Sequence, residues 1–225
     1  MSIPLRRSQN AGDREREGLA LDYPVNPDRE WVARRFSSGR PAAAAARPRG
    51  DHDLNPGTVP DPPLIPAAVL VPLVDRTRGL TVLLTERTEH LADHAGQISF
   101  PGGRIEAGDV GPEDAALRET EEETGLSRRR VEILGRLDTY ITRTGFTVTP
   151  VVAIANPPLE LDPDPREVAA VFEVPLAFFL DPANHRRCSR PFRGSVRQFY
   201  AMPYGDRYIW GATAGMLVNL YERLS

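Results

Sequence analysis

A chain of 225 residues with 40% hydrophobic residues and a formal net charge of −3 is typical of one globular domain that can bury its own core. The near-neutral charge argues against a general nucleic-acid-binding protein, and no apolar run is long enough for a membrane span or a signal-peptide core, so we expect neither nucleic acid nor membrane as a partner. The single cysteine, Cys188, excludes an internal disulfide and fits a reducing compartment, so the expected location is the cytoplasm.

Residues 1–62 differ from the rest of the chain in composition. They contain many arginines, an alanine run and frequent Pro, Gly and Asp, without periodic apolar residues. This composition predicts a largely disordered segment. The stretch NPDREWVARRF is an exception, because Asn26 can cap a helix that begins at Pro27. The acidic residues scattered through this segment argue against an organelle transit peptide.

From residue 63 to residue 225 the pattern predicts one compact domain. Expected strands cover residues 67–75, 80–87, 97–100, 130–140, 146–155 and 168–174, and residues 196–204 and 207–210 form an expected hairpin. Expected helices cover residues 112–124 and 211–224, and residues 175–181 form a short helix or a turn. Mixed strands with few helices indicate an α+β domain, in the form of an α/β/α sandwich.

The helix expected at residues 112–124 ends an unusually acidic stretch. Eight carboxylates and one base, Arg118, lie between Glu106 and Glu123. Three of the carboxylates, Glu119, Glu122 and Glu123, have the spacing of one helix face, where each like-charged pair costs about 0.2–0.5 kcal/mol. A solvated acidic face is the plain interpretation. A bound Mg²⁺ or Mn²⁺ is the functional one, because these cations prefer carboxylate oxygens.

The loop before this helix favours the metal interpretation. Pro101-Gly102-Gly103 ends a strand with two residues that tolerate close approach of a ligand, although a tight turn explains two glycines equally well in isolation. The carbonyl of Gly103 could join the carboxylates around a metal. Arg118, four residues before Glu122, could orient a glutamate or partly neutralise the cluster.

The same stretch resembles the Nudix box, with Gly103 as its glycine and RETEEETGL, Arg118 to Leu126, as its end. Two departures are that Asp109 stands where the first glutamate belongs and that eight residues rather than seven separate it from Arg118. The upstream run LLTERTEHLADHAGQISFPGG is similar to the additional signature of the coenzyme A pyrophosphatase branch, which shares both departures. The resemblance covers about residue 64 to the C-terminus and leaves out the arginine-rich start.

The resemblance implies a Nudix fold, a mixed sheet between helices with the box as loop–helix–loop. It also implies metal-dependent hydrolysis of coenzyme A or its derivatives to 3′,5′-ADP and 4′-phosphopantetheine, with Mg²⁺ or Mn²⁺ as cofactor. One alternative is another nucleoside diphosphate derivative, such as NADH, ADP-ribose or a dinucleotide. A second alternative is a Nudix-fold ligand sensor without catalysis, against which the three retained glutamates argue. The sequence leaves open whether the protein is a homodimer.

Candidate roles follow for the residues around the box. Glu119 and Glu123 are expected metal ligands together with Gly103, and Glu122 is either a third ligand or the general base. Arg118 and Glu167 are further catalytic candidates, although Glu167 fits a surface residue equally well. The candidate substrate-binding residues are Arg87, His94, Gln97, Arg104 and Arg143. Each of these has a structural alternative: a surface arginine, a histidine that braces the loop, or a residue of a strand.

Overall fold

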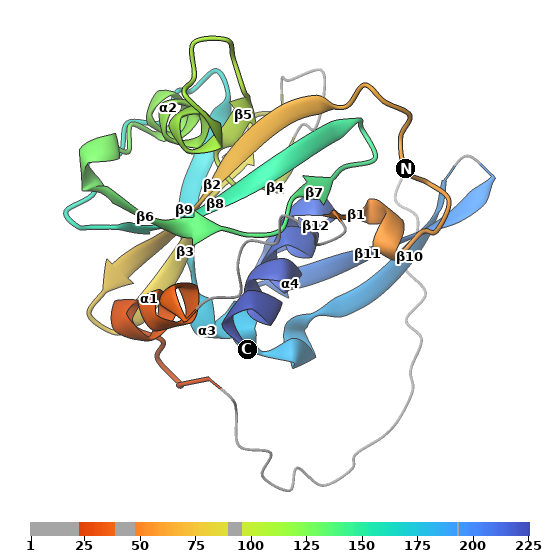
Figure 1. Cartoon of the computed structure of the whole chain (residues 1–225). Helices are drawn as coiled ribbons and strands as arrows, with labels where there is room; N and C mark the ends of the chain where they lie inside the picture. Colours follow the sequence, from red (N-terminus) through yellow and green to blue (C-terminus); the bar gives the residue numbers. More distant parts are fainter. Residues whose placement is uncertain (1–22, 39–47, 90–95, 193) are drawn as a thin grey trace, which may run out of the picture.

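The computed structural model describes residues 23–38, 48–89, 96–192 and 194–225 (Figure 1). Its helices are α1 (Arg29–Ser37), α2 (Pro112–Thr124), α3 (Leu176–Leu180) and α4 (Ala212–Leu224), with short 3₁₀ turns at Asp51–Asp53, Arg128–Arg130 and Pro182–Asn184. Its strands are β1 (Arg49–Gly50), β2 (Ile65–Arg76), β3 (Gly79–Arg87), β4 (Ile98–Ser99), β5 (Gly102–Arg104), β6 (Val131–Arg136), β7 (Tyr140–Ile141), β8 (Phe146–Ala155), β9 (Val168–Pro175), β10 (Arg186–Phe192), β11 (Ser195–Tyr204) and β12 (Arg207–Trp210). Among the described residues, no helix is both long and apolar enough to cross a membrane.

The large sheet is mixed. Strands β2 and β8 pair in parallel over ten residues, from Ile65 opposite Phe146 to Val74 opposite Ala155. On its other edge β2 pairs antiparallel with β5 and β3, and β3 continues to β4 and β9. The long buried runs of β2 and β8 suit central strands that are covered on both faces.

Helices cover both faces of this sheet, as Figure 1 shows, with α2 on one side and α1, α3 and α4 on the other. Ala115 and Ala116 of α2 pack against Ala68 and Leu70 of β2. The opposite face of the sheet joins the main core, which contains the apolar side of α4 and residues of β11 and β12. The sandwich of mixed sheet and helices confirms the predicted α+β class, and it is the arrangement that the resemblance to the Nudix family implies.

A second, three-stranded antiparallel sheet of β10, β11 and β12 packs beside α4. The hairpin predicted at residues 196–204 and 207–210 is confirmed as β11 and β12. Strand β10 was not predicted from the sequence. It pairs with β11 along its whole length, with Arg190 opposite Arg197.

Part of the first 62 residues packs on the domain, so the predicted boundary at residue 62 needs correction. Helix α1 begins at Arg29 with Asp28 as its N-cap, whose carboxylate accepts from the Trp31 amide at 2.8 Å, rather than with Asn26 and Pro27 as expected. Val32 of α1 is fully buried, since α1 packs against α4 and β6. The expectation of disorder for residues 1–22 and 39–47 lies outside the described residues.

Residues 49–55 also join the fold. Strand β1 pairs in parallel with β7, and Asn55 exchanges two hydrogen bonds with the backbone of Gln198 in β11, at 2.8 and 2.9 Å. These bonds hold the Asp51–Asp53 turn against the sheet of β10, β11 and β12, which we call the hairpin sheet. Asp51 thereby enters the wall of the cavity described below.

Candidate active site

Helix α2 spans Pro112 to Thr124, the range predicted from the sequence. Pro112 occupies the first turn, and Gly125 ends the helix in the left-handed conformation, with φ 73°. Thr120, which stands at a hydrophobic position of the Nudix box, is buried and donates its hydroxyl to the Ala116 carbonyl at 2.6 Å. The threonine therefore satisfies its polar group within the helix, and the inner face of α2 can still pack on the sheet.

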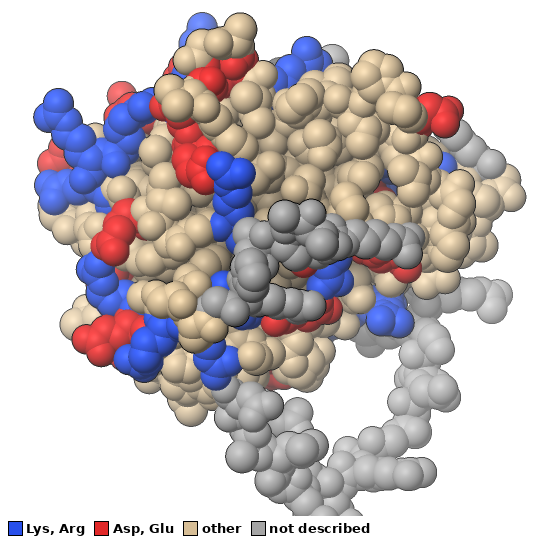
Figure 2. Space-filling view, viewed as in Figure 1, with Lys and Arg blue, Asp and Glu red and all other residues tan. Residues whose placement is uncertain are grey.

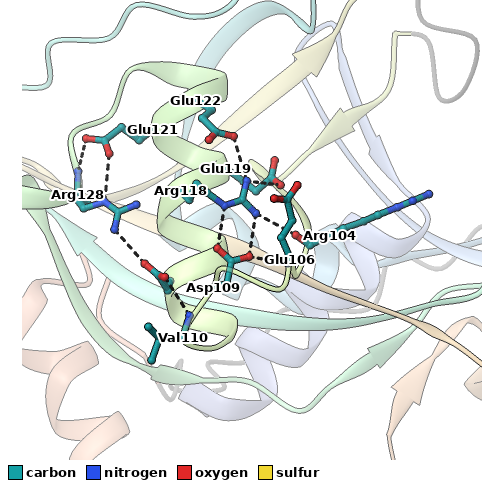
Figure 3. A network of polar contacts seen from close by, with 10 residues as sticks. Arg104, Glu106, Asp109, Val110, Arg118, Glu119, Glu121, Glu122 and Arg128 are labelled. Carbon is teal, nitrogen blue, oxygen red and sulfur yellow. Dashed lines mark hydrogen bonds and ion pairs between the residues drawn. The ribbon is translucent and has the colours of Figure 1, made fainter.

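Arg118 is the centre of the polar network in Figure 3. Its guanidinium donates to both carboxylate oxygens of Asp109, at 2.9 and 3.0 Å, and to the Arg104 carbonyl at 3.2 Å. It also donates to Glu119 at 3.0 Å and to Glu122 at 3.2 Å. One arginine thus joins the acidic loop to two of the three facing glutamates.

Asp109 acts as the brace of the acidic loop. Besides the bidentate pair with Arg118, it accepts a hydrogen bond from the Glu106 amide at 2.7 Å, and only 4% of its side chain is exposed. The hydrogen bonds from Arg118 lower the pKa of Asp109 to about 2. The aspartate that departs from the Nudix box therefore serves as a fixed anion for Arg118.

Glu123 and Glu119 lie against β5. The Gly102 amide donates to Glu123 at 3.1 Å, and the nearest nitrogen of Arg87 is 4.0 Å from the same carboxylate. Burial raises the pKa of Glu123 to about 7 and raises the pKa of Glu119 as well. Two carboxylates are thus held close together where water screens their charge poorly.

Gly102 and Gly103 leave the space that these carboxylates need. A Cβ atom at Gly103 would lie 2.5–2.6 Å from the carboxyl group of Glu119, and one at Gly102 would lie 2.4 Å from the Ala68 carbonyl oxygen. Both glycines belong to β5, a strand that the sequence predicted only as a turn. Any larger residue at either position would have to displace a glutamate or the backbone of β2.

The other predicted catalytic residues are more exposed. Glu122 is 61% exposed, against 8% for Glu123. Glu167 is also exposed, and its negative charge contributes to the raised pKa of Glu123, which places it in the electrostatic neighbourhood of the site. On the outer side of α2, Arg128 pairs with Asp114 and Glu121, and Arg136 pairs with Glu113, so acidic and basic side chains lie together there (Figure 2).

The donor set fits a divalent cation in its chemistry. Carboxylate and carbonyl oxygens are the ligands that Mg²⁺ and Mn²⁺ prefer, and Glu119 and Glu123 approach the two glycines from one helix face. Within the described part of the chain, no three His, Cys, Asp or Glu side chains converge on one point as metal ligands. Arg118 holds Glu119 and Glu122 in the observed arrangement, so a cation would compete with its guanidinium for them.

A cavity of about 660 Å³ adjoins the glycines of β5. Its lining comes from β2, β8, the hairpin sheet and α4, and includes both glycines and five arginines: Arg87, Arg104, Arg143, Arg190 and Arg197. The volume falls in the range of small-molecule sites, about 300–1,000 Å³. Asp51 is the one acidic residue among the described lining residues, so positive charge dominates the cavity.

Four of the five predicted substrate-binding residues line this cavity: Arg87, Gln97, Arg104 and Arg143. The fifth, His94, lies outside the described residues. The sequence analysis missed Asp51, Arg190, Phe192, Arg197 and Trp210, which also line it. No motif surrounds Asp51, Arg190, Phe192 or Arg197, and only the pairing of β10 with β11 and the docking of residues 49–55 could have identified them.

The comparisons with known proteins agree with this architecture. The model of the NUDIX domain family matches residues 64–192. Relatives from Escherichia coli O7:K1 (strain IAI39) and E. coli K12, each named "Uncharacterized Nudix hydrolase NudL", are 42% identical over 155 residues, which cover 68% of this chain and 80% of theirs.

Solved structures show more distant similarity. The NUDIX domain of Shewanella oneidensis NrtR, complexed with ADP ribose, has a TM-score of 0.45 at 20% identity and covers 73% of this chain and 91% of its own. The Nudix hydrolase RenU from M. smegmatis has a TM-score of 0.43 at 27% identity and covers 50% of this chain and 71% of its own. Because both TM-scores lie below 0.5, the assignment rests on the sequence matches, and by these the chain belongs to the Nudix hydrolase family.

Proposed function

We propose that this Nudix hydrolase cleaves the diphosphate of coenzyme A or its derivatives, with Mg²⁺ or Mn²⁺ as cofactor, to 3′,5′-ADP and 4′-phosphopantetheine. The choice of coenzyme A rests on the similarity of Leu83–Gly103 to the signature of the coenzyme A pyrophosphatase branch. The family assignment alone supports the coarser statement, hydrolysis of a nucleoside diphosphate derivative.

The observation that carries the proposal is the position of the glycines of β5. Gly102 and Gly103 touch the carboxylates of α2 through Glu123 and Glu119, and they also line the arginine-rich cavity. A diphosphate in the cavity would therefore meet arginine donors and lie next to the carboxylates. Bare carboxylates alone would repel such a substrate, which is why the arrangement needs cations.

Each box residue has a role in this proposal. Glu119 and Glu123 would hold the cation together with the carbonyl of Gly103, and Glu122 would supply a third ligand or accept the proton of the attacking water. A bound divalent cation offsets the charge of the diphosphate and activates that water. Arg118 keeps Glu119 and Glu122 oriented through the hydrogen bonds described above.

Arginines on the cavity side orient the diphosphate. Arg87 lines the cavity 4.0 Å from Glu123, and its Nε is buried without a hydrogen-bond partner among the described residues. A guanidinium that the protein leaves partly unsatisfied is suited to donate to phosphate oxygens in a bidentate manner. Arg104, exposed at the end of β5 and 5.7 Å from the Phe146 ring centre, is the second candidate for this contact.

Incubation of the protein with Mg²⁺ or Mn²⁺ and a panel of coenzyme A, NADH, ADP-ribose and an NDP-sugar tests the proposal. We expect the highest kcat/KM for coenzyme A, with 3′,5′-ADP and 4′-phosphopantetheine identified by mass spectrometry. A higher kcat/KM for NADH or ADP-ribose would refute the choice of coenzyme A and keep the hydrolase. Absence of turnover with every compound in the panel would favour a ligand sensor.

A further inference from the structure

Three arginines form one wall of the cavity, which we name the arginine wall: Arg143, Arg190 and Arg197. Arg190 of β10 and Arg197 of β11 are directly opposite each other in the hairpin sheet. Arg143 lies in the turn between β7 and β8, and its backbone amide donates to Asp51, the carboxylate that also accepts from the Arg197 guanidinium. Two parts of the chain that are far apart in sequence, the β7–β8 turn and the pair of β10 and β11, therefore bring positive charge to one place.

This concentration of charge is unfavourable in the protein alone. Like charges directly opposite each other on antiparallel strands destabilise the pair. Asp51 is the one described carboxylate in the cavity lining, and it cannot neutralise three arginines. The arrangement is the positive counterpart of the clustered glutamates of α2, and an anion would offset its cost.

The hydrogen bonds of Asp51 leave the arginine wall incompletely satisfied. One of its oxygens accepts from the Tyr140 hydroxyl at 3.0 Å, and the other is shared between the Arg143 amide at 3.0 Å and Arg197 at 3.3 Å. The Nε of Arg197 is buried and has no partner within the described part of the chain. A buried guanidinium with one shared carboxylate retains donor capacity for a ligand.

The other two guanidinium groups are held on aromatic rings. Arg143 lies 4.5 Å from the ring centre of Phe192, and Arg190 lies 4.7 Å from that of Trp210. Neither guanidinium makes a hydrogen bond or ion pair with the described residues. Stacking fixes the plane of a guanidinium and leaves the N–H donors along its edge available, a geometry that suits phosphate oxygens.

The arginine wall is distinct from the site next to the carboxylates. Arg87 and Arg104 belong to β3 and β5, beside the glycines that contact Glu119 and Glu123. The β10–β11 hairpin lies away from α2, on the other face of the large sheet (Figure 1). The apolar side chains of Val69, Phe146, Val148 and Met216 line the cavity between these charged groups.

We propose that the arginine wall binds a phosphate monoester that the substrate carries in addition to its diphosphate. This inference rests on the proposed function, since coenzyme A carries such a group on its ribose. The arginine wall then acts as a specificity site: it selects substrates with a second anionic group, and the carboxylates of α2 serve the reaction itself.

Binding of 3′,5′-ADP and of 5′-AMP, measured by isothermal titration calorimetry with Mg²⁺ present, tests the inference without turnover. The two compounds differ by the second phosphate. We expect wild-type protein to bind 3′,5′-ADP about 10- to 100-fold more tightly, as hydrogen bonds between charged groups suggest. Arg190→Gln should remove most of this difference and leave the affinity for 5′-AMP nearly unchanged. Equal affinities of the wild-type protein for both compounds would overturn the inference.

Arg187→Gln is the matched control. Arg187 lies on β10, but on the opposite face from Arg190, where it contacts Tyr200 and does not line the cavity. This variant should keep the wild-type preference, and an equal loss of preference in both variants would overturn the inference. Arg197→Gln serves as a second test, with its melting temperature measured because Arg197 also bonds Asp51.

Hydrolysis of coenzyme A and of dephospho-coenzyme A separates the two proposals. If neither is cleaved while NADH is, the proposed function fails, and the calorimetric comparison still decides the arginine wall. If both are cleaved with equal kcat/KM, the proposed function stands and the arginine wall is overturned. We expect a preference for coenzyme A of about tenfold or more, which Arg190→Gln abolishes.

Discussion

The two charged regions of this protein, the carboxylates of α2 and the arginine wall, differ in how their charge is satisfied. Arg118 donates hydrogen bonds to Asp109, Glu119 and Glu122, so three carboxylates of the negative region are held in place by one guanidinium of the protein. The arginine wall has a single shared carboxylate, Asp51, and a buried guanidinium nitrogen without a partner in the described residues. The difference suggests that the first region is organised before a ligand arrives, and that the second depends on the ligand for its counter-charge.

The largest expected effect concerns the carboxylates themselves. Glu122→Gln and Glu123→Gln should each abolish turnover, a loss of about 10³-fold or more, because a neutral amide cannot replace a carboxylate next to a cation and a diphosphate. At position 123 the glutamine retains an acceptor for the Gly102 amide, so the fold should persist. Steady-state kinetics measures the loss of turnover, and circular dichroism checks the fold. Full activity in both variants would refute the assignment of Glu122 and Glu123 to a metal site.

The next largest effect is expected from Arg118, which donates hydrogen bonds to Asp109, Glu119 and Glu122. Arg118→Lys removes the bidentate contact with Asp109 and the simultaneous hold on two glutamates. We expect an activity about 10- to 100-fold lower and a higher Mg²⁺ requirement, as for other residues that orient metal ligands. Mg²⁺ titrations of activity measure it. Arg128→Lys, at the exposed pairs with Asp114 and Glu121, is the control and should change neither value by much.

The contact between β5 and the carboxylates gives a smaller effect. In Gly103→Ala the new methyl group meets the Glu119 carboxyl group at 2.5–2.6 Å, so the glutamate has to move. Overpacking of this kind costs about 1–3 kcal/mol in the free energy of unfolding and should also raise the Mg²⁺ requirement. Gly108→Ala, where a Cβ atom meets nothing within 4 Å, is the control. Equal behaviour of both variants in urea unfolding and Mg²⁺ titration would contradict the close contact.

The smallest effect tests the neutralisation of the acidic loop through pH. Hydrogen bonds from Arg118 lower the pKa of Asp109 from 3.8 to about 2, so the folded protein binds this proton less readily than the unfolded chain. The stabilisation is complete above about pH 4 and is lost as the pH falls towards 2. Asp109→Asn should therefore lower the melting temperature at neutral pH. The melting temperature of this variant should also fall less steeply with pH between pH 4 and 2 than that of the wild-type protein. An unchanged slope, measured by thermal scans, would show that the pair does not form.

Elements with a strong local pattern were predicted from the sequence. Helix α2 has an N-terminal proline, first-turn acids and a C-terminal glycine, and its predicted range is confirmed. Strands β2, β3 and β8 consist of continuous apolar runs, which identify buried strands without tertiary information.

Elements that exist only through pairing were missed. Strand β5 has three residues, two of them glycines, and locally resembles a turn, yet it pairs with Ala67–Val69 of β2. Strand β10, with the sequence RRCSRPF, lacks apolar alternation and is stabilised by its pairing with β11. Tertiary contacts determine whether such segments form strands, and the local β-propensity of their residues does not predict it.

In the candidate site, the sequence predicted the residues that belong to a motif and missed those that do not. The glutamates, Arg118, Arg87, Arg104 and Gln97 belong to or adjoin the Nudix box and the upstream signature, so the sequence identified them as candidates. Arg190 and Arg197 belong to no motif, and nothing in the sequence distinguishes an arginine that lines a cavity from one on the surface. Their position became apparent only when the hairpin and the Asp51 turn came together in the fold.

The docking of residues 49–55 has a consequence for how this protein can be divided. The family match begins at residue 64, but the folded unit begins earlier, because Asp51 and Asn55 tie the wall of the cavity to β11 and α1 buries Val32 against the core. A chain that began at residue 64 would keep the entire Nudix box and Arg197, but it would lose Asp51, the carboxylate that accepts a hydrogen bond from Arg197. The proposed metal ligands and the three arginines of the wall would remain in the shortened chain, and the carboxylate that joins Arg143 to Arg197 would be missing.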